Sequence, residues 1–209
     1  MGTRRFTDAD LAYIRANYVT LEALCADRPD APDEIRALIE KRKLPGPSYV
    51  LEDGTGMFPS DYFRLIDDAG GPDRLGACFA ARHQAASVAD HTDPDEFAGD
   101  WEAYLDGNYG VCLRQVTPEA IVRKAALVSS LCELLMLPRP RNTNWRRSLR
   151  KQVDELDALE REFTPDYDRG ADQDRPPTRD LLINAARERY PDVFEGEASE
   201  ESMPRLATR

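Results

Sequence analysis

The sequence predicts a mainly α-helical protein with an N-terminal winged-helix-like unit, which contains one β-hairpin, and a C-terminal helical bundle. Three observations support this fold class. Apolar residues recur every three or four positions over most of the chain, as on the buried face of an amphipathic helix. Asp53 and Gly54 form a strong turn signal between two short apolar runs that could pair as strands. Threonine or proline stands at the start of several apolar runs, as at helix N-termini.

The chain should begin with two helices. Thr7 and Asp10 are spaced as in a capping box, and apolar residues follow them at helical spacing. We therefore expect a helix over residues 8–18. Thr20 is a candidate N-cap for a short second helix, because its hydroxyl can accept a hydrogen bond from a free backbone N–H group.

A third helix and the hairpin should follow. Pro32 suits the first turn of a helix, and the two acidic residues after it favour the positive end of the helix dipole. Residues 49–58 should form a hairpin with a two-residue type I′ turn. In that register, Val50 would lie opposite Met57.

Two folded regions are expected, with a soft boundary in the polar and acidic residues 89–99. The winged-helix-like unit would comprise residues 1–88, and the helical bundle residues 100–190. Thr117, followed by proline, is a strong N-terminal signal for an apolar helix. A long amphipathic helix should run over residues 144–163, because its apolar residues step by three or four positions.

The end of the chain carries weaker signals. Residues 166–177 carry few apolar side chains and are interpreted as a linker. Residues 178–190 should form a last helix. Residues 191–209 are polar and are expected to form a disordered tail.

Composition and charge limit the function classes. The chain has 209 residues, of which 39 are acidic and 28 are Lys or Arg, for a net charge of −11. An acidic surface repels phosphate backbones, so nucleic acid is a disfavoured partner. The longest apolar stretch, residues 125–137, is shorter than the roughly 20 residues that a membrane span needs. Because no secretory signal pattern is recognised, we expect a cytoplasmic protein without a membrane span.

The cysteines and histidines form no recognisable metal or disulfide pattern. Four cysteines lie far apart, with no C-x-x-C pair: Cys25, Cys78, Cys112 and Cys132. His83 and His91 match no zinc-site spacing, and no G-x-S-x-G motif is present. Support for Cys112 as a nucleophile is weak, since no histidine is near it in sequence. We therefore predict reduced thiols, no metal and no cofactor, and the catalytic residues, if any, remain unknown.

Arg114, Thr117 and Arg123 are the candidate anion-binding residues. Thr117 precedes a helix whose N-terminus offers free backbone N–H donors, and the two arginines add positive charge nearby. This combination suits a carboxylate or a phosphate group. The alternative is a structural ion pair of Arg114 with Glu119 or Asp154, which would leave no site.

DNA binding is an alternative function, because the order of helices and hairpin is similar to that of a winged helix. Residues 33–43 would then form the recognition helix and residues 49–58 the wing. A recognition helix contacts base edges with its N-terminal end. Here that end carries Asp33 and Glu34, which would meet the phosphates with like charge. Nucleic acid is thus the less favoured partner.

Several segments are shared with a known family. They are residues 47–51 and 53–55, Trp101 with Tyr104, residues 109–114, 116–119 and 153–163. Together they resemble an uncharacterised actinobacterial family of natural-product biosynthesis proteins with a domain of unknown function. The resemblance extends over most of the chain between residues 47 and 190. It implies a biosynthetic pathway and no particular catalytic residues.

The resemblance, the acidic charge and the lack of catalytic motifs together favour an accessory protein. Its expected partner is a pathway protein or a small anionic metabolite. A winged-helix DNA-binding regulator, an enzyme of unrecognised type and a structural scaffold remain the alternatives.

Overall fold

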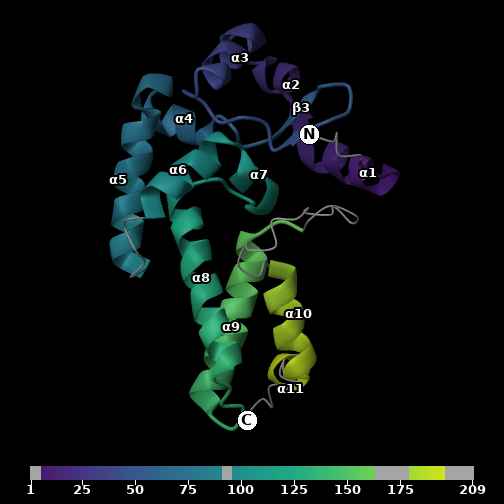
Figure 1. Ribbon diagram of the computed structural model, residues 1–209, viewed down its shortest axis with the longest axis vertical. Helices are drawn as coiled ribbons and strands as arrows, with labels where there is room; N and C mark the ends of the chain where they lie inside the picture. The colour runs from purple at the N-terminus through teal and green to yellow at the C-terminus, as the bar shows by residue number, and fades with distance from the viewer. Residues whose placement is uncertain (1–5, 91–95, 163–178, 196–209) are drawn as a thin grey trace, which may run out of the picture. The chain divides into compact units, whose positions relative to one another are not determined.

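The computed structural model describes residues 6–90, 96–162 and 179–195 (Figure 1). Within these residues there are eleven helices and one three-stranded antiparallel sheet, so the protein is mainly helical, as its periodicity predicts. The described residues fall into two compact units. The first contains residues 6–90, 96–126 and 159–162, and the second contains residues 127–158 and 179–195.

The N-terminal elements of the first unit are α1 (Asp8–Asn17), β1 (Tyr18–Thr20), α2 (Leu21–Cys25), α3 (Pro32–Glu40), β2 (Tyr49–Val50) and β3 (Gly56–Pro59). The predicted capping box is present at α1. The hydroxyl of Thr7 accepts a hydrogen bond from the N–H of Asp10 at 3.2 Å, and the carboxylate of Asp10 accepts one from the N–H of Thr7 at 3.0 Å. Thr20 caps α2 by accepting a hydrogen bond from the N–H of Ala23 at 3.3 Å.

The hairpin of β2 and β3 has a different register from the predicted one. Val50 lies opposite Gly56, one position away from the expected partner Met57. The loop therefore has three residues, 52–54, and Gly54 at its end has a φ of +85°. A turn followed by a left-handed residue is a common three-residue hairpin loop, and glycine adopts that conformation without steric cost.

The strand β1 is an element that the sequence analysis misses, because it falls at the end of the predicted first helix. It pairs antiparallel with β3, so the strand order is β1-β3-β2. Tyr18 is only 2% exposed, and its hydroxyl donates to the carbonyl of Gly110 at 3.0 Å. Contacts with residues far away in the sequence therefore hold the backbone of Tyr18 in an extended conformation. The order of elements in this region is compatible with a winged helix.

The first unit continues with α4 (Arg64–Ala69), α5 (Pro72–Asp90), α6 (Phe97–Leu105), α7 (Asn108–Cys112) and the first turns of α8 (Pro118–Met136). Helix α5 extends into the predicted polar loop, α6 begins within it, and α7 was not predicted. Gly107, with a φ of +76°, separates α6 from α7. A Cβ atom at this position would lie 2.6 Å from the carbonyl oxygens of Gly46 and Pro47, so the close approach requires glycine.

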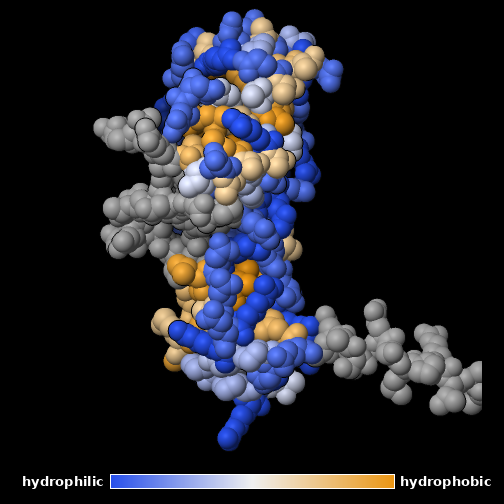
Figure 2. Space-filling model, turned by 90° about the vertical axis from the view of Figure 1, so that its right-hand side faces the viewer, coloured by the Kyte–Doolittle hydropathy of each residue, from blue (hydrophilic) through white to orange (hydrophobic). Residues whose placement is uncertain are grey.

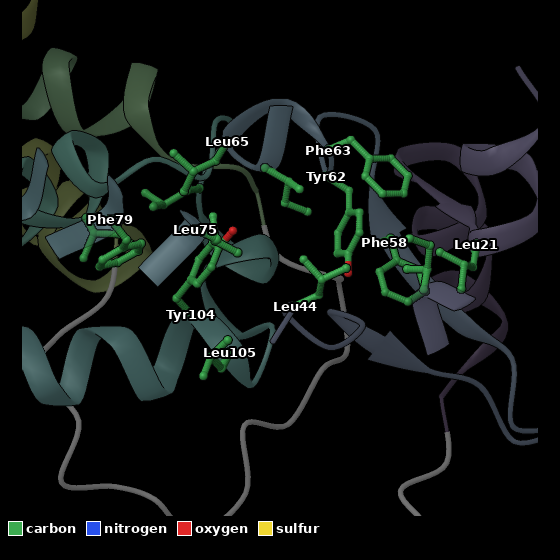
Figure 3. Close-up of a cluster of buried hydrophobic side chains, with 14 of the residues drawn as sticks. Leu21, Leu44, Phe58, Tyr62, Phe63, Leu65, Leu75, Phe79, Tyr104 and Leu105 are labelled. Carbon is green, nitrogen blue, oxygen red and sulfur yellow. The ribbon is translucent and has the colours of Figure 1, made fainter. Parts of the chain in front are cut away.

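A hydrophobic core fills the first unit (Figure 3). The ring centroid of Tyr62 lies 5.0 Å from that of Phe58 and 4.9 Å from that of Phe63, in edge-to-face contacts. Phe79 on α5 is fully buried, with its ring centroid 5.0 Å from that of Tyr104 on α6. The core thus fixes the positions of α5 and α6, which carry His83 and Asp100.

The second unit contains the remaining turns of α8, most of α9 (Thr143–Leu159), α10 (Arg179–Arg189) and α11 (Pro191–Phe194). Figure 1 shows its helices lying side by side. The indole N–H of Trp145 on α9 donates to the carbonyl of Leu134 on α8 at 3.2 Å. The indole ring also packs edge to face against Tyr190 after α10, with centroids 4.9 Å apart. Trp145 therefore connects three helices of this unit.

Residues 191–194 form a helical turn in a region that we expected to be a disordered tail. Pro191 suits a first helical position, and Val193 is buried at 6% exposure. Asp192 forms an ion pair with Arg146 at 2.5 Å. A short polar segment is thus held by tertiary contacts that its local sequence does not indicate. The predicted linker and residues 196–209 lie outside the described residues.

Candidate functional site

An isolated antiparallel β-bridge connects the segment after α7 to the residue that follows α9. It pairs Leu113 with Glu160. The N–H of Arg161 donates to the carbonyl of Cys112 at 2.7 Å. The predicted helix over residues 144–163 ends early at this bridge, at Leu159. Glu160 and Arg161 leave the helix because their backbone pairs with Leu113 and Cys112. The bridge places Cys112 close to Glu160.

Lys124 completes a buried group that we call the cysteine–lysine–glutamate cluster, formed by Cys112, Lys124 and Glu160. Lys124 lies on the second turn of α8, and its Nζ donates to Sγ of Cys112 at 3.1 Å. The same Nζ lies 2.5 Å from Oε1 of Glu160. Glu160 is 0% exposed, and neither of its carboxylate oxygens forms a well-aligned hydrogen bond among the described residues. The lysine–glutamate contact is therefore an ion pair only.

The charge of Lys124 is set by opposing effects. Burial lowers the pKa of Lys124, but the adjacent Cys112 and Glu160 raise it by more, so the pKa is higher than the usual value. Lys124 is therefore an ammonium group at neutral pH. A neighbouring cation stabilises the thiolate form of a cysteine, which is the nucleophilic form. This arrangement can support thiol chemistry at Cys112.

A second buried group, the histidine network, contains His83, Ser87, Asp100 and Tyr109 and connects α5, α6 and α7. Nε2 of His83 lies 2.8 Å from Oδ2 of Asp100, and the hydroxyl of Tyr109 donates to the other carboxylate oxygen. Oγ of Ser87 lies 3.4 Å from Nδ1 of His83. Burial, and then the carboxylate of Asp100, raise the pKa of Tyr109. His83 and Ser87 are each 1% exposed, so the network suits a structural role better than attack on a substrate.

The three predicted anion-binding residues have different surroundings in the structure. Thr117 caps α8, and its hydroxyl accepts a hydrogen bond from the N–H of Ala120 at 3.2 Å. Arg123 forms an ion pair with Asp90 at 3.0 Å. Arg114 has an exposed side chain.

The predicted structural alternative for Arg114 involves acids that contact other arginines. Both carboxylate oxygens of Glu119 accept hydrogen bonds from Arg82, at 2.7 and 2.9 Å. The carboxylate of Asp154 lies 3.9 Å from Arg150. Among the described residues of the first unit no ion pair connects Arg114 to Glu119. An anion site that uses Arg114 therefore stays a prediction.

Lys124 and Glu160 are not among the predicted site residues, although the sequence carries a signal for both. Lys124 stands four residues after buried Ala120 and three before buried Leu127, so it lies on the apolar face of its helix. Glu160 likewise comes four residues after buried Leu156. A charged residue at an apolar position of a periodic pattern indicates a buried charge, which needs an opposite charge or hydrogen bonds beside it.

Two further findings concern the chemistry of the described residues. Within them, no cluster of three or more His, Cys, Asp or Glu side chains has an arrangement that could hold a metal ion. The same residues include no helix with the length and apolar character needed to cross a membrane.

Comparison with known proteins places the chain in a family. A family of unknown function, DUF6058, matches residues 74–191, which is more than half of the chain. No curated protein and no solved structure matches. The matched range includes the whole of both buried groups. The expected domain of unknown function is thus confirmed, and the chain belongs to the DUF6058 family.

Proposed function

We propose that this chain is an accessory protein of a natural-product biosynthetic pathway and binds a partner protein through its N-terminal unit. The contact region would be the α3–hairpin surface, which we define by its exposed acidic residues Asp33, Glu34, Glu52 and Asp53. One observation carries the proposal. Acidic groups stand exposed at the two places where a winged helix contacts DNA, while Arg36, Arg42 and Lys43 nearby are paired with carboxylates of the same chain.

Two of the three basic residues that follow α3 are paired with carboxylates. Arg42 contacts Glu102 at 2.5 Å and Asp106 at 2.9 Å. Lys43 contacts Asp73 at 2.8 Å. An exposed ion pair contributes little to stability, but its carboxylate would stay beside any phosphate group that approached the cation. The positive charge at this end of α3 is therefore largely neutralised.

The other end of α3 is acidic. Asp33 and Glu34 are exposed in its first turn, and Arg36 on the next turn contacts Asp33 at 2.6 Å and also Glu22. A DNA phosphate would meet like charge here. A partner protein with a basic surface would meet opposite charge, which accelerates association and aligns the two surfaces.

One cavity of the first unit is too small to hold a metabolite. This cavity lies in the first unit, has a volume of about 20 Å³, and is lined by residues that include Ser48, Asp61 and Gly110. About one water molecule would fill such a volume, whereas small-molecule pockets usually measure roughly 300 Å³ or more. Figure 2 shows that hydrophilic side chains cover much of the visible face, although hydrophobic patches are also present.

The proposal is tested by measuring binding of the full chain to purified proteins encoded by the neighbouring genes. We expect one of them to bind, with an affinity that falls between about 0.05 and 0.2 M salt because the contacts are electrostatic. The double variant Asp33→Lys with Glu34→Lys should weaken this binding by roughly 10-fold or more. Glu188 is an exposed acid on α10. The variant Glu188→Lys is the matched control and should leave partner binding unchanged.

Two results would overturn the proposal. The first is unchanged partner affinity of the double variant, which would remove the α3–hairpin surface from the interface. The second is enrichment of one sequence motif from a random duplex DNA library at about 0.1 M salt, which would favour the regulator alternative.

A further inference from the structure

Two buried cysteines of the first unit have contrasting surroundings. Cys25 is 6% exposed, and burial, followed by the charge of Asp30, raises the pKa of its thiol. Cys112 is 8% exposed, but the ammonium group of Lys124 lies 3.1 Å from its sulfur. Since thiolates react with oxidants and neutral thiols react poorly, Cys112 should be the more readily oxidised of the two.

Glu160 adds a proton acceptor to the same site. Its carboxylate lies 2.5 Å from Nζ of Lys124, and Oε2 has no hydrogen-bond partner among the described residues. Transfer of one proton from the ammonium group to this carboxylate would leave a neutral amine. The lone pair of that amine would be within 3.1 Å of the sulfur of Cys112. The site therefore holds an oxidisable sulfur, a nitrogen nucleophile and a base.

We propose that Cys112 and Lys124 form a reversible redox-modification site, at which a small peroxide oxidises Cys112 and Lys124 then bonds to its sulfur. The product is a sulfenamide, with a covalent S–N bond between the two side chains. It would join the end of α7 to the second turn of α8.

In the first step, the thiolate sulfur of Cys112 attacks one oxygen of hydrogen peroxide. An S–O bond forms, the O–O bond breaks, and the departing hydroxide takes up a proton to become water. The sulfur is oxidised by two electrons to a sulfenic acid, and the peroxide is reduced.

In the second step, Glu160 accepts a proton from the ammonium group of Lys124, and the amine attacks the sulfur of the sulfenic acid. The S–N bond forms and the S–O bond breaks, while the protonated carboxyl of Glu160 returns its proton to the leaving hydroxide. The bonded nitrogen then releases its second proton to water, which replaces the proton that the hydroxide of the first step took from water. The sum is one thiol, one amine and one hydrogen peroxide, giving one sulfenamide and two waters. Sulfenic acids condense with backbone nitrogens to sulfenamides, and an amine nitrogen within 3.1 Å of the sulfur would take the same role here.

The sulfenamide would protect Cys112 against further oxidation. A sulfenic acid can otherwise proceed to sulfinic and sulfonic acids, which are irreversible in most proteins. Two equivalents of an external thiol would reverse the link by attacking the sulfur, releasing the amine and forming a disulfide of the reductant.

The test treats the full chain with hydrogen peroxide, followed by alkylation of remaining thiols and tandem mass spectrometry. We expect a cross-link between the peptides of Cys112 and Lys124, with a mass loss of about 2 Da relative to the separate side chains. Dithiothreitol should remove it. Cys25 should stay alkylatable in the same sample and serves as the internal control.

Variants separate the roles of the two partner residues. Lys124→Gln should abolish the cross-link and slow the oxidation of Cys112, because the thiolate loses its neighbouring cation. A sulfenic-acid probe should label the fraction of Cys112 that is oxidised. Glu160→Gln should keep the amine and slow cross-linking by on the order of 100-fold, as expected for loss of a proton acceptor. Circular dichroism checks that each variant folds. If a variant does not fold, the measurement on the wild type still decides the proposal.

The wild-type result can overturn the proposal directly. It fails if peroxide leaves Cys112 unmodified, converts it to a sulfinic acid with no link to Lys124, or joins it to another cysteine. It also fails if Cys25 reacts as fast as Cys112, because the ammonium group would then have no effect on reactivity.

Discussion

The histidine network and the cysteine–lysine–glutamate cluster are both buried in the first unit and both use α7, but they differ in how completely their polar atoms are paired. In the histidine network, both ring nitrogens of His83 and both oxygens of Asp100 have partners. In the cluster, the buried carboxylate of Glu160 contacts an ammonium group without a well-aligned hydrogen bond.

This difference indicates different roles. A buried polar network with every atom paired stabilises one arrangement of the helices around it. A buried ion pair with incomplete hydrogen bonding contributes little or nothing to stability compared with apolar residues of the same size. Residues of the second kind remain available for chemistry, and this is why we place the reactive site at Cys112 and not at Ser87.

The largest effect should come from removing the cation of the cluster. Lys124→Met leaves Glu160 buried and unpaired, and we expect the free energy of unfolding to fall by about 3–5 kcal/mol. Denaturant unfolding measures this loss. The double variant Lys124→Met with Glu160→Leu removes both charges and should recover most of it. A double variant no more stable than the single one would show that the pair itself stabilises the fold.

The pH dependence of the free energy of unfolding tests the charge state of Lys124. The pKa of Lys124 is raised above the usual 10.5, so its stabilising contribution is fully present below that value and is lost as the pH rises through the folded-state pKa. The stability difference between wild type and Lys124→Met should therefore stay constant at neutral pH and shrink at alkaline pH. Constancy of the difference at alkaline pH would contradict the assigned charge state.

An intermediate effect should follow from breaking the histidine network at its centre. Asp100→Ala leaves Nε2 of His83 and the hydroxyl of Tyr109 without their partner, and a buried unpaired group costs about 1–3 kcal/mol. We expect a loss of about 3 kcal/mol in total, measured by denaturant unfolding. Tyr109→Phe, which leaves the contact of Asp100 with His83 intact, should cost only about 1 kcal/mol. Equal losses in the two variants would show that Asp100 does not hold the network together.

The smallest effect is expected at Arg114, outside both buried groups. Its side chain is exposed and no ion pair with Glu119 is present among the described residues, so Arg114→Ala should change the free energy of unfolding by less than about 0.5 kcal/mol. A larger loss would indicate a structural role. If carboxylate- or phosphate-bearing metabolites raise the melting temperature of the wild type and not of Arg114→Ala, the predicted anion site is supported.

Local sequence signals predict the helix starts well. Thr7, Thr20 and Thr117 cap the helices that follow them, because a cap depends on residues within three positions of the threonine. The predictions fail where a contact with a segment far away in the sequence determines the backbone conformation. Tyr18 is extended because it pairs with β3 and bonds to Gly110, which no pattern around residue 18 indicates. The hairpin register depends on Gly54 adopting a positive φ at the third loop position.

The helical class, most helix starts and the acidic character of the chain could be predicted from the sequence, because they follow from periodicity, caps and composition. The chemistry of the cysteine–lysine–glutamate cluster depends on packing. Cys112, Lys124 and Glu160 belong to three different elements, and the bridge after α7 and α9 brings them within hydrogen-bond or ion-pair distance. Contacts between residues so far apart in the chain arise when the core packs, so spacing in the sequence cannot reveal them.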